Sequence, residues 1–482
     1  MNLKIVLRSL GILLICEAIA LLPPTFVALL YQDGDLPAFL ITIGMVLTVG
    51  MLLAFIKPSC KNIYARDGFA IVALGWLLMS FFGAFPFYIS GAFPSFVDSF
   101  FESSSGLTTT GSSVLTAVEG LPHGILFWRS FTHWIGGMGI LVLTIAILPS
   151  LGTGSMQVMK AESPGPIVGR IVPKLGQTAK ILYGIYLGMT LLEVVILWIA
   201  GMNLFDSFIH ALGTVGTGGF SNMNASVGYY NSPLIDWIIT IFMILCGVNF
   251  SLYYFILKGN FKSFFKNNEL RTYLCILFGV ILLITFDLMR QGTYSSFGEA
   301  FRFSSFQSAS VMTTTGYATT DFNEWSLFSK MLLLLLMFIG GCAGSTAGGL
   351  KVSRAIIGMK SIKYSVKQII HPNGYYSVRM DDKKIEDKTV SSVLSYFFVY
   401  IVVFTLSILL IALDGFDFTT TVTSVITALN NIGPGLGLVG PTGNFSAFSD
   451  FSKVVFSILM IIGRLEIYPI LLLLTPDLWK KS

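Results

Sequence analysis

The sequence predicts an all-α integral membrane protein with two N-terminal helices followed by four helix–pore loop–helix repeats around a central pore, ten spans in all. Two observations support this fold class. Of the 482 residues, 54% are hydrophobic and 11% are charged, and the mean hydropathy is +0.78, so the chain cannot cover itself with a soluble surface. A loop rich in Thr and Gly also recurs four times between long apolar segments, and such repeats indicate a repeated architecture.

The repeated loop has a glycine at its centre. Its four copies read LTTTGSS at 107–113, GTGGFS at 216–221, TTTGYATT at 313–320 and, in degenerate form, NNIGPG at 430–435. The same 13-residue spacing separates Asp98 from Gly111 and Asp206 from Gly219. This spacing favours Gly219 over Gly218 as the central glycine of the second copy. A single copy would be read as an ordinary turn, but four copies at matching places predict four parts of one site.

Such loops suit the binding of a dehydrated potassium ion. In a bilayer, irregular backbone is tolerated only inside protein or facing a water-filled path, and rings of backbone carbonyls can replace the hydration shell of potassium. Glycine permits the backbone angles that turn successive carbonyls the same way. A short helix that ends at the pore axis also points its negative carbonyl end at a cation. The four loops are therefore expected to form a selectivity filter.

Each part of this filter comprises a central glycine and one neighbour on either side. The expected potassium-binding residues are Thr110, Gly111, Ser112, Gly218, Gly219, Phe220, Thr315, Gly316, Tyr317, Ile432, Gly433 and Pro434. Potassium at the filter is the only metal expected, and no covalent cofactor is expected.

About 20 apolar residues cross a bilayer, which places the expected spans. Two spans precede the repeats, and each repeat has a first and a second helix; the segments are 3–31, 36–56, 68–92, 126–150, 176–201, 233–257, 271–290, 326–362, 390–413 and 451–474. Half-length segments, too short to cross, lie inside the repeats at 97–107, 205–215, 299–312 and 417–429. The corresponding domains are a helix pair (1–60), pore repeats 1 to 3 (61–151, 152–262 and 263–364) and a cytoplasmic linker with pore repeat 4 (365–482).

Basic residues predict the orientation of the chain. Lys and Arg gather between the repeats and at the C-terminus, whereas the side of the loops carries more Asp and Glu. By the positive-inside rule the basic segments and both termini are cytoplasmic, and the filter opens outward. The long segment 358–388 is the largest candidate surface for a cytoplasmic partner. Contact of the basic loops with anionic lipid is the alternative explanation.

The second helix of the third repeat is expected to break. Its stretch 340–349 reads GGCAGSTAGG, and each glycine costs a helix about 1 kcal/mol relative to alanine. Backbone freed at that depth must face protein or a water-filled path. This predicts a gate made of Gly340, Gly341, Ala343, Gly344, Ser345, Thr346, Ala347, Gly348 and Gly349, with a packing-driven kink as the alternative. The other three second helices are expected to lack so long an interruption.

Arg464 lies deep in the last expected span, where a charge is costly and marks a functional candidate. We expect this arginine to form a barrier in the pore. The alternative is a buried structural ion pair. Glu466 is a poor local partner for such a pair, because residues i and i+2 do not share a helix face.

The four loops resemble those of the Trk/Ktr/HKT superfamily of potassium transporters, and the length and the extra N-terminal helix pair are most similar to its TrkH family. The resemblance covers essentially the whole chain, although the fourth loop departs from the Thr-rich pattern. It implies potassium uptake across the bacterial inner membrane, with all four filter parts in one chain. Glycine at the key position of all four loops is associated with potassium selectivity, and serine in the first loop with sodium.

The resemblance also implies the regulation of the pathway. Arg464 would face the pathway beneath the filter, and the 340–349 loop would act as an intramembrane gate. A TrkA-like ring of nucleotide-binding domains would bind from the cytoplasm and regulate transport. A homodimer is expected as well.

Other functions have weaker support in the sequence. The G-x-G-x-x-G match at 435–440 has no strand before it, and 344–351 has leucine where a phosphate-binding loop needs lysine. The four histidines show no metal-ligand spacing, so no enzyme is expected. The main alternative is a proton- or sodium-coupled symporter with Glu193 at mid-membrane, although a structural pairing of Glu193 explains that residue equally well. A membrane scaffold would need no repeated filter.

Overall fold

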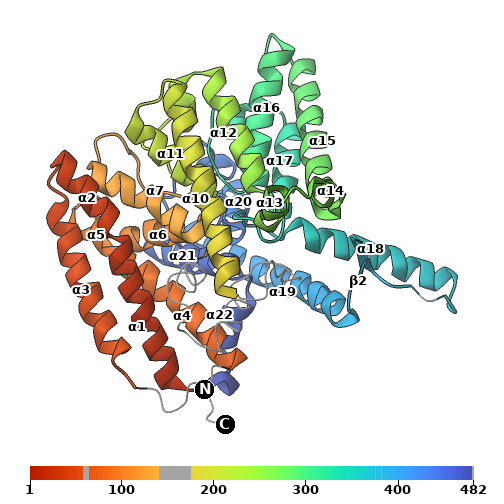
Figure 1. The fold of residues 1–482 in the computed structure, drawn as a ribbon. Coiled ribbons are helices and arrows are strands. Elements are labelled where there is room, and N and C mark those ends of the chain that lie inside the picture. Colours follow the sequence, from red (N-terminus) through yellow and green to blue (C-terminus); the bar gives the residue numbers. More distant parts are fainter. Residues whose placement is uncertain (58–63, 140–174, 375, 382, 480–482) are drawn as a thin grey trace.

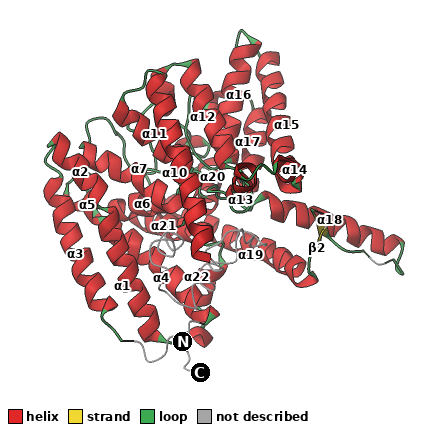
Figure 2. Cartoon of the chain, viewed as in Figure 1, coloured by secondary structure: helices red, strands yellow, loops and turns green. Residues whose placement is uncertain are grey.

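The computed structural model describes residues 1–57, 64–139, 175–374, 376–381 and 383–479. This part of the chain is mainly helical, with one small two-stranded sheet (Figures 1 and 2). Six of its helices are long and apolar enough to cross a membrane, or seven if one bent pair counts as a single span. The expectation of a helical membrane protein is therefore confirmed, whereas the count of ten spans stays a prediction.

The N-terminal helices pack as a hairpin at one edge of the molecule (Figure 1). Helices α1 (Leu3–Ala20) and α2 (Leu22–Tyr31) form one 29-residue apolar stretch, and α3 (Leu36–Ala54) returns beside α1. Two glycines allow the close approach: a Cβ on Gly11 would lie 2.7 Å from the carbonyl oxygen of Gly50. Small residues at such contacts are typical of helices that pack within a membrane.

The remaining helices follow in four groups. The first contains α4 (Ala65–Gly83), α5 (Phe85–Ile89), α6 (Phe96–Leu107) and α7 (His123–Gly137). The second contains α10 (Leu175–Ile199), α11 (Leu204–Gly216), α12 (Pro233–Cys246) and α13 (Phe250–Leu257). The third contains α14 (Phe261–Lys266), α15 (Asn268–Arg290), α16 (Phe297–Met312), α17 (Leu327–Ile339) and α18 (Val352–Ile370). The fourth contains α19 (Asp387–Ile411), α20 (Phe418–Asn430), α21 (Asp450–Arg464), α22 (Tyr468–Leu473) and α23 (Pro476–Trp479).

The small sheet joins the third and fourth groups. Strands β1 (Arg379–Met380) and β2 (Lys383–Lys384) pair in antiparallel fashion, with Arg379 opposite Lys384. Together with α18 and the start of α19, the sheet forms an arm that extends away from the other helices (Figure 1).

The four half-length helices α6, α11, α16 and α20 begin in the same way. In each, a side chain before the first turn accepts a hydrogen bond from the backbone N–H three residues later; these caps are Ser95, Asn203, Ser296 and Asp417. Such a cap satisfies one of the free N–H groups at a helix start. Asp98, Asp206 and Glu299 add negative charge to the first turn of α6, α11 and α16, which favours a helix beginning there.

Within the described residues, the second helices of repeats two, three and four are each interrupted, and the break in repeat three, between Ile339 and Val352, is the longest of these. Helix α7 ends at Gly137, and 140–150 of its expected span lie outside the described residues. Helices α12 and α13 are bent by 95°, so 233–257 is not one straight span. Helix α17 stops at Ile339 and α18 begins at Val352, while α21 stops at Arg464 and α22 begins at Tyr468.

Close packing against the half-length helices explains two of these ends. A Cβ on Gly136 would collide with the carbonyl oxygen of Leu107, and one on Gly463 with that of Leu429. Leu107 and Leu429 lie in the last turns of α6 and α20. Helices α7 and α21 therefore each pass the half-length helix of their own repeat at a glycine, and each ends within about one turn of that contact.

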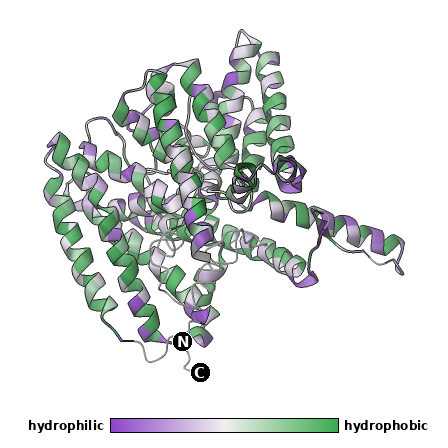
Figure 3. Cartoon of the chain, in the orientation of Figure 1, coloured by the Kyte–Doolittle hydropathy of each residue, from purple (hydrophilic) through white to green (hydrophobic). Residues whose placement is uncertain are grey.

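Apolar side chains face outward and polar ones gather at the centre. Helices α3, α15 and α19 carry apolar residues along their outer faces (Figure 3), including Leu52, Phe286 and Phe398, which are 70%, 71% and 71% exposed. The Thr-rich loops after α6 and α16 are buried. A lipid-facing exterior around a polar interior explains this reversal of the usual soluble pattern.

Candidate ion-binding site

The four Thr/Gly loops meet in a closed ring. The central glycine of each loop faces a carbonyl oxygen of the next loop. This oxygen belongs to the residue just before the central glycine of that next loop. A Cβ added to the facing glycine would collide with or crowd the oxygen. The pairs are Gly111 with Gly218, Gly219 with Thr315, Gly316 with Ile432, and Gly433 with Thr110, the last at 2.8 Å. The order runs from loop 1 to loop 4 and back to loop 1, so the sequence repeats surround one axis.

The backbone repeats around this ring. The φ angles of Gly111, Gly219, Gly316 and Gly433 are +80°, +79°, +87° and +96°, a region that side chains disfavour. Two residues earlier, each loop has a left-handed residue: Thr109, Thr217, Thr314 and Asn431 have φ angles of +57°, +55°, +56° and +56°. This match places Gly219, not Gly218, at the central position of the second loop.

One hydrogen bond also recurs in every loop. The N–H of the residue before the central glycine donates to a carbonyl five residues back, in the last turn of the half-length helix. These bonds are Thr110 to Ser105 (2.8 Å), Gly218 to Gly213 (2.8 Å), Thr315 to Ser310 (2.9 Å) and Ile432 to Thr427 (3.0 Å). These hydrogen bonds satisfy the four N–H groups within each repeat and do not use the carbonyls of Thr110, Gly218, Thr315 and Ile432.

Threonine side chains bond to one another behind this backbone. The Oγ1 atoms of Thr108 and Thr110 are 2.8 Å apart, and the corresponding pair in loop 3 has the same distance. In the fourth loop, Asn431 Nδ2 donates to Thr110 Oγ1 at 3.0 Å and to the Met460 carbonyl at 2.8 Å. The asparagine that makes loop 4 look degenerate thus ties this loop to loop 1.

One cavity of about 210 Å³ lies against the ring. Seven of the twelve expected filter residues line it: Gly111, Ser112, Gly219, Phe220, Gly316, Gly433 and Pro434. Thr110, Gly218, Thr315 and Ile432 do not line the cavity, but their carbonyl oxygens face the central glycines of the neighbouring loops. The Tyr317 side chain points away from the cavity, and its hydroxyl is 3.2 Å from the carbonyl oxygens of both His210 and Phe220. Among the described lining residues, Arg129 is the only charged one.

The 340–351 loop lies directly against two of the filter loops. Gly348 N–H donates to Thr314 Oγ1 at 2.6 Å, and Gly349 N–H donates to the Asn430 carbonyl at 3.0 Å. Near its start, Cys342 N–H donates to the Gly247 carbonyl at 2.9 Å, at the bend between α12 and α13. The expected gate residues are thus brought to the ring, where loops 3 and 4 leave their half-length helices.

Glu269, in the first turn of α15, anchors this loop and was not expected from the sequence. Its Oε1 accepts hydrogen bonds from Ala343 N–H at 2.7 Å and from Ser353 N–H at 3.0 Å. One buried carboxylate therefore fixes both the beginning of the loop and the first turn of α18. An acidic residue at a helix start is usually explained by the helix dipole, which is why the sequence did not single it out.

Arg464 is bound to backbone carbonyls and does not extend into open space. Its guanidinium donates to the carbonyls of Gly136 and Gly137 at the end of α7, the latter at 2.6 Å, and to that of Thr346 at 2.9 Å. Nη1 is 3.4 Å from Thr109 Oγ1 in the first filter loop. Glu466 pairs with Arg354 of α18.

Glu193, the candidate for ion coupling, lies apart from this arrangement. It is fully buried on α10, is not among the residues that line the cavity, and forms no ion pair within the described part of the chain.

Comparison with known proteins gives a consistent answer over the whole length. The model of the TrkH family, described as cation transport protein, matches residues 35–481. The chain is 39% identical over 485 residues to the Trk system potassium uptake protein TrkH of Escherichia coli K12, covering 100% of both. It is 36% identical to the TrkG protein of the same organism, covering 99% of both. The crystal structure of the potassium transporter TrkH from Vibrio parahaemolyticus matches with a TM-score of 0.90 at 37% identity, covering 100% of both chains.

Proposed function

The chain belongs to the TrkH family of cation transport proteins, and we propose that it takes up potassium through the ring of carbonyls formed by its four Thr/Gly loops. It is a multi-pass membrane protein and a potassium uptake transporter of the Trk type, and the inner membrane is its expected location. The observation that carries the filter proposal is the closed ring, in which four left-handed glycines each abut a carbonyl of the next loop.

The chemistry of the ring favours a bare cation. The lining loops present backbone carbonyls and no carboxylate, and carbonyl dipoles can replace the water around potassium. The half-length helices end three or four residues before the central glycines, at Leu107, Gly216, Met312 and Asn430. Their negative ends therefore add to the attraction of a cation at the ring.

Uptake of potassium by liposomes that contain the purified protein tests this function. We expect potassium to enter down its own gradient without a pH or sodium gradient, with rubidium competing and sodium not competing. Equal uptake of sodium and potassium would contradict the filter. A strict requirement for a proton or sodium gradient would instead favour the coupled symporter, for which the buried Glu193 is the observation in support.

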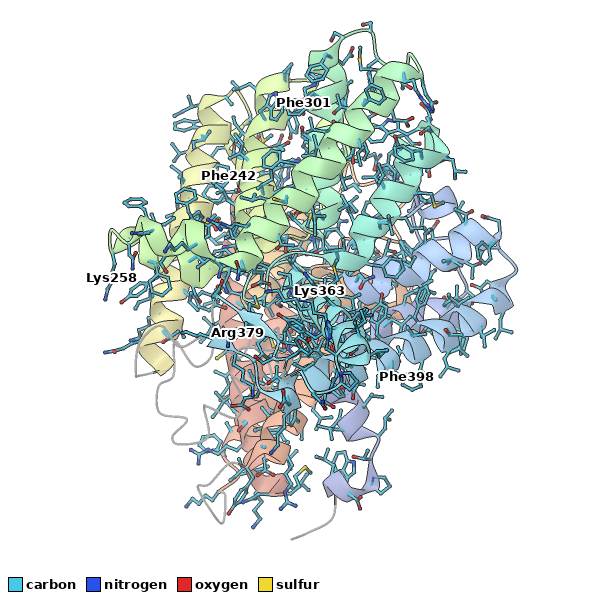
Figure 4. The ribbon with its side chains drawn as sticks, turned by 90° about the vertical axis from the view of Figure 1, so that its right-hand side faces the viewer. Phe242, Lys258, Phe301, Lys363, Arg379 and Phe398 are labelled. Carbon is cyan, nitrogen blue, oxygen red and sulfur yellow. The ribbon has the colours of Figure 1, made fainter. Side chains whose placement is uncertain are left out.

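We place both termini and the 358–388 arm on the cytoplasmic side. The N-terminus and helix α22, near the end of the described chain, lie at the same end of the molecule (Figure 1). Lys258, Lys363 and Arg379 lie lower in Figure 4 than Phe242 and Phe301, and basic residues gather on the cytoplasmic side of membrane proteins. A cytoplasmic TrkA-like nucleotide-binding subunit is the partner proposed for this arm, and a homodimer is proposed for the assembly.

The 340–351 loop is proposed as the gate. It leads without a spacer into α18, which forms part of the arm (Figure 1). A partner that pulls α18 would therefore act on the bonds of Gly348 and Gly349 to the filter loops. Glu269 would oppose this movement, because it holds the starts of both the loop and α18.

Replacing Arg464 by alanine is expected to raise potassium flux about tenfold when the partner is absent. A tenfold change corresponds to roughly 1.4 kcal/mol, which is the size of one or two charge-assisted hydrogen bonds. The arginine joins Thr346 of the gate loop to the end of α7, so its loss frees the loop and removes a positive charge. Flux into liposomes measures the effect. Arg302→Ala, which removes a partly buried arginine paired with Asp236, is the control; unchanged flux in folded Arg464→Ala would refute the role.

A further inference from the structure

A buried ion pair joins the first half-length helix to the second helix of its repeat. Arg129 of α7 and Glu102 of α6 approach to 2.7 Å between Nη2 and Oε1, and Nε donates to the same oxygen at 2.8 Å. The two side chains are 2% and 0% exposed. Burying two charges is unfavourable unless further hydrogen bonds satisfy them, and a buried pair therefore calls for an account of what it positions.

Both members of the pair bind the segments that leave the first two filter loops. Glu102 accepts from Ser113 Oγ at 2.9 and 3.1 Å and from Val114 N–H at 3.3 Å, just after loop 1. Arg129 Nη1 donates to the Ser221 carbonyl at 3.2 Å, and the guanidinium lies 4.2 Å from the ring centre of Phe220, both at the end of loop 2. The planar fork of arginine allows these contacts at the same time.

One turn further along α7, His133 makes a second link, between loop 2 and the last turn of α6, which leads into loop 1. Its Nε2 accepts from Phe220 N–H at 3.2 Å, so Nδ1 carries the proton and donates to the Gly106 carbonyl at 2.8 Å. The i, i+4 spacing places Arg129 and His133 on one face of the helix. Helix α7 therefore presents two side chains that set the distance between loops 1 and 2.

No buried ion pair of the described chain binds the filter loops at the other three junctions of the ring, and the partly exposed carboxylate of Asp321, which accepts from Thr442 Oγ1 at 3.0 Å, is a charged group between the segments after loops 3 and 4. Tyr317 joins loop 3 to loop 2, Asn323 joins the segments after loops 3 and 4, and Asn431 joins loop 4 to loop 1. A neutral hydrogen bond is weaker than a charge-assisted one. Among the described residues, the junction of loops 1 and 2 is thus distinguished by a fully buried ion pair.

We propose that Glu102 and Arg129 are positioning residues that fix the spacing of the carbonyls in filter loops 1 and 2 and thereby determine the discrimination between potassium and sodium. The inference rests on the proposed function of the ring. Arg129 also lines the cavity, where its positive charge would repel a cation. The carboxylate of Glu102 neutralises this charge. Geometry and charge then have separable effects: the fork of Arg129 controls selectivity, and the balance of charge controls the rate.

Four variants and one control separate these effects. Arg129→Lys keeps the charge but loses the fork, Glu102→Gln keeps the shape but leaves Arg129 uncompensated, and Glu102→Gln with Arg129→Gln removes both charges. Ser113→Ala removes one hydrogen bond to Glu102 and is the mildest change. Asp236→Asn, in the ion pair between α12 and α16, is the matched control away from the ring. Potassium flux and the potassium-to-sodium permeability ratio are both measured in liposomes.

Arg129→Lys should lower the permeability ratio about fivefold to tenfold with potassium flux near the parental value, and Ser113→Ala about twofold. Glu102→Gln should reduce potassium flux as well, and the double variant should restore flux but not selectivity. Asp236→Asn should change neither quantity. When the parent is selective, an unchanged permeability ratio in both Arg129→Lys and Ser113→Ala would overturn the positioning role of Glu102 and Arg129. Absence of selective flux in the parent itself would instead overturn the proposed function.

Discussion

Gly111→Ser is expected to lower the potassium-to-sodium selectivity of the protein about tenfold, the effect of roughly 1.4 kcal/mol of discrimination. The φ angle of Gly111 is +80°, and a Cβ on it would collide with the carbonyl oxygen of Gly218. Loop 1 or loop 2 must therefore shift at the junction that the proposed filter needs for its geometry. Permeability ratios of the purified variant in liposomes measure the change.

Gly120→Ser is the matched control for this substitution. Gly120 has a φ angle of +92°, but a Cβ there would meet no atom within 4 Å, so the variant has similar backbone strain without the collision. It should keep parental selectivity and flux. Equal selectivity in Gly111→Ser and the parent would mean that the ring does not discriminate between the ions.

Deletion of residues 345–347 is expected to raise potassium flux several-fold and to make it less dependent on the cytoplasmic partner. The deletion removes the Thr346 carbonyl that Arg464 binds and the Thr346 hydroxyl that donates to the Cys246 carbonyl. Gly348 and Gly349 then have too little chain to keep their bonds to Thr314 and Asn430. Flux with and without the partner measures both effects.

A deletion of equal length in the exposed α15–α16 loop, at 291–293, controls for the loss of three residues. It should leave flux and its regulation unchanged. If the 345–347 deletion folds and inserts but also behaves like the parent, the loop is a packing kink and the gate lies elsewhere.

Features encoded by neighbouring residues could be read from the sequence. The half-length helix expected at 97–107 is observed as Phe96–Leu107, and that expected at 417–429 as Phe418–Asn430. Each begins at a polar cap and ends at a Thr/Gly or Asn/Gly loop, so both ends are determined within a few residues. The central glycines were identifiable for the same reason, because a repeated local pattern requires their positive φ angles.

Features that depend on distant contacts were missed. Helices α7 and α21 end near glycines that pack on Leu107 and Leu429, and only the tertiary structure shows which glycines meet such a neighbour. Glycines within apolar segments are common at packing contacts that do not interrupt a helix. For α12 and α13, only Gly247, Asn249 and Ser251 interrupt the apolar residues at the bend, and so short an interruption changes the mean hydropathy of the segment little.

Polar partners far apart in the sequence were equally hidden. Asn431 reaches Thr110 across 321 positions, and Arg464 reaches Thr346 across 118. The depth of Arg464 in an apolar segment marked it as a candidate, but its carbonyl partners lie on two distant elements, α7 and the 340–351 loop. Glu102 lies in the middle of a short helix with an ordinary amphipathic pattern, and nothing in its neighbourhood indicates Arg129.

Direct localisation of a heavy potassium analogue tests the central claim most sharply. The measurement is anomalous diffraction from crystals of the protein grown in rubidium or thallium. We predict a peak on the axis of the ring, within coordination distance of the carbonyl oxygens of Thr110, Gly218, Thr315 and Ile432, that disappears when sodium replaces the heavy ion. A well-ordered ring with no peak, or a peak of equal occupancy elsewhere in the membrane region, would contradict the account.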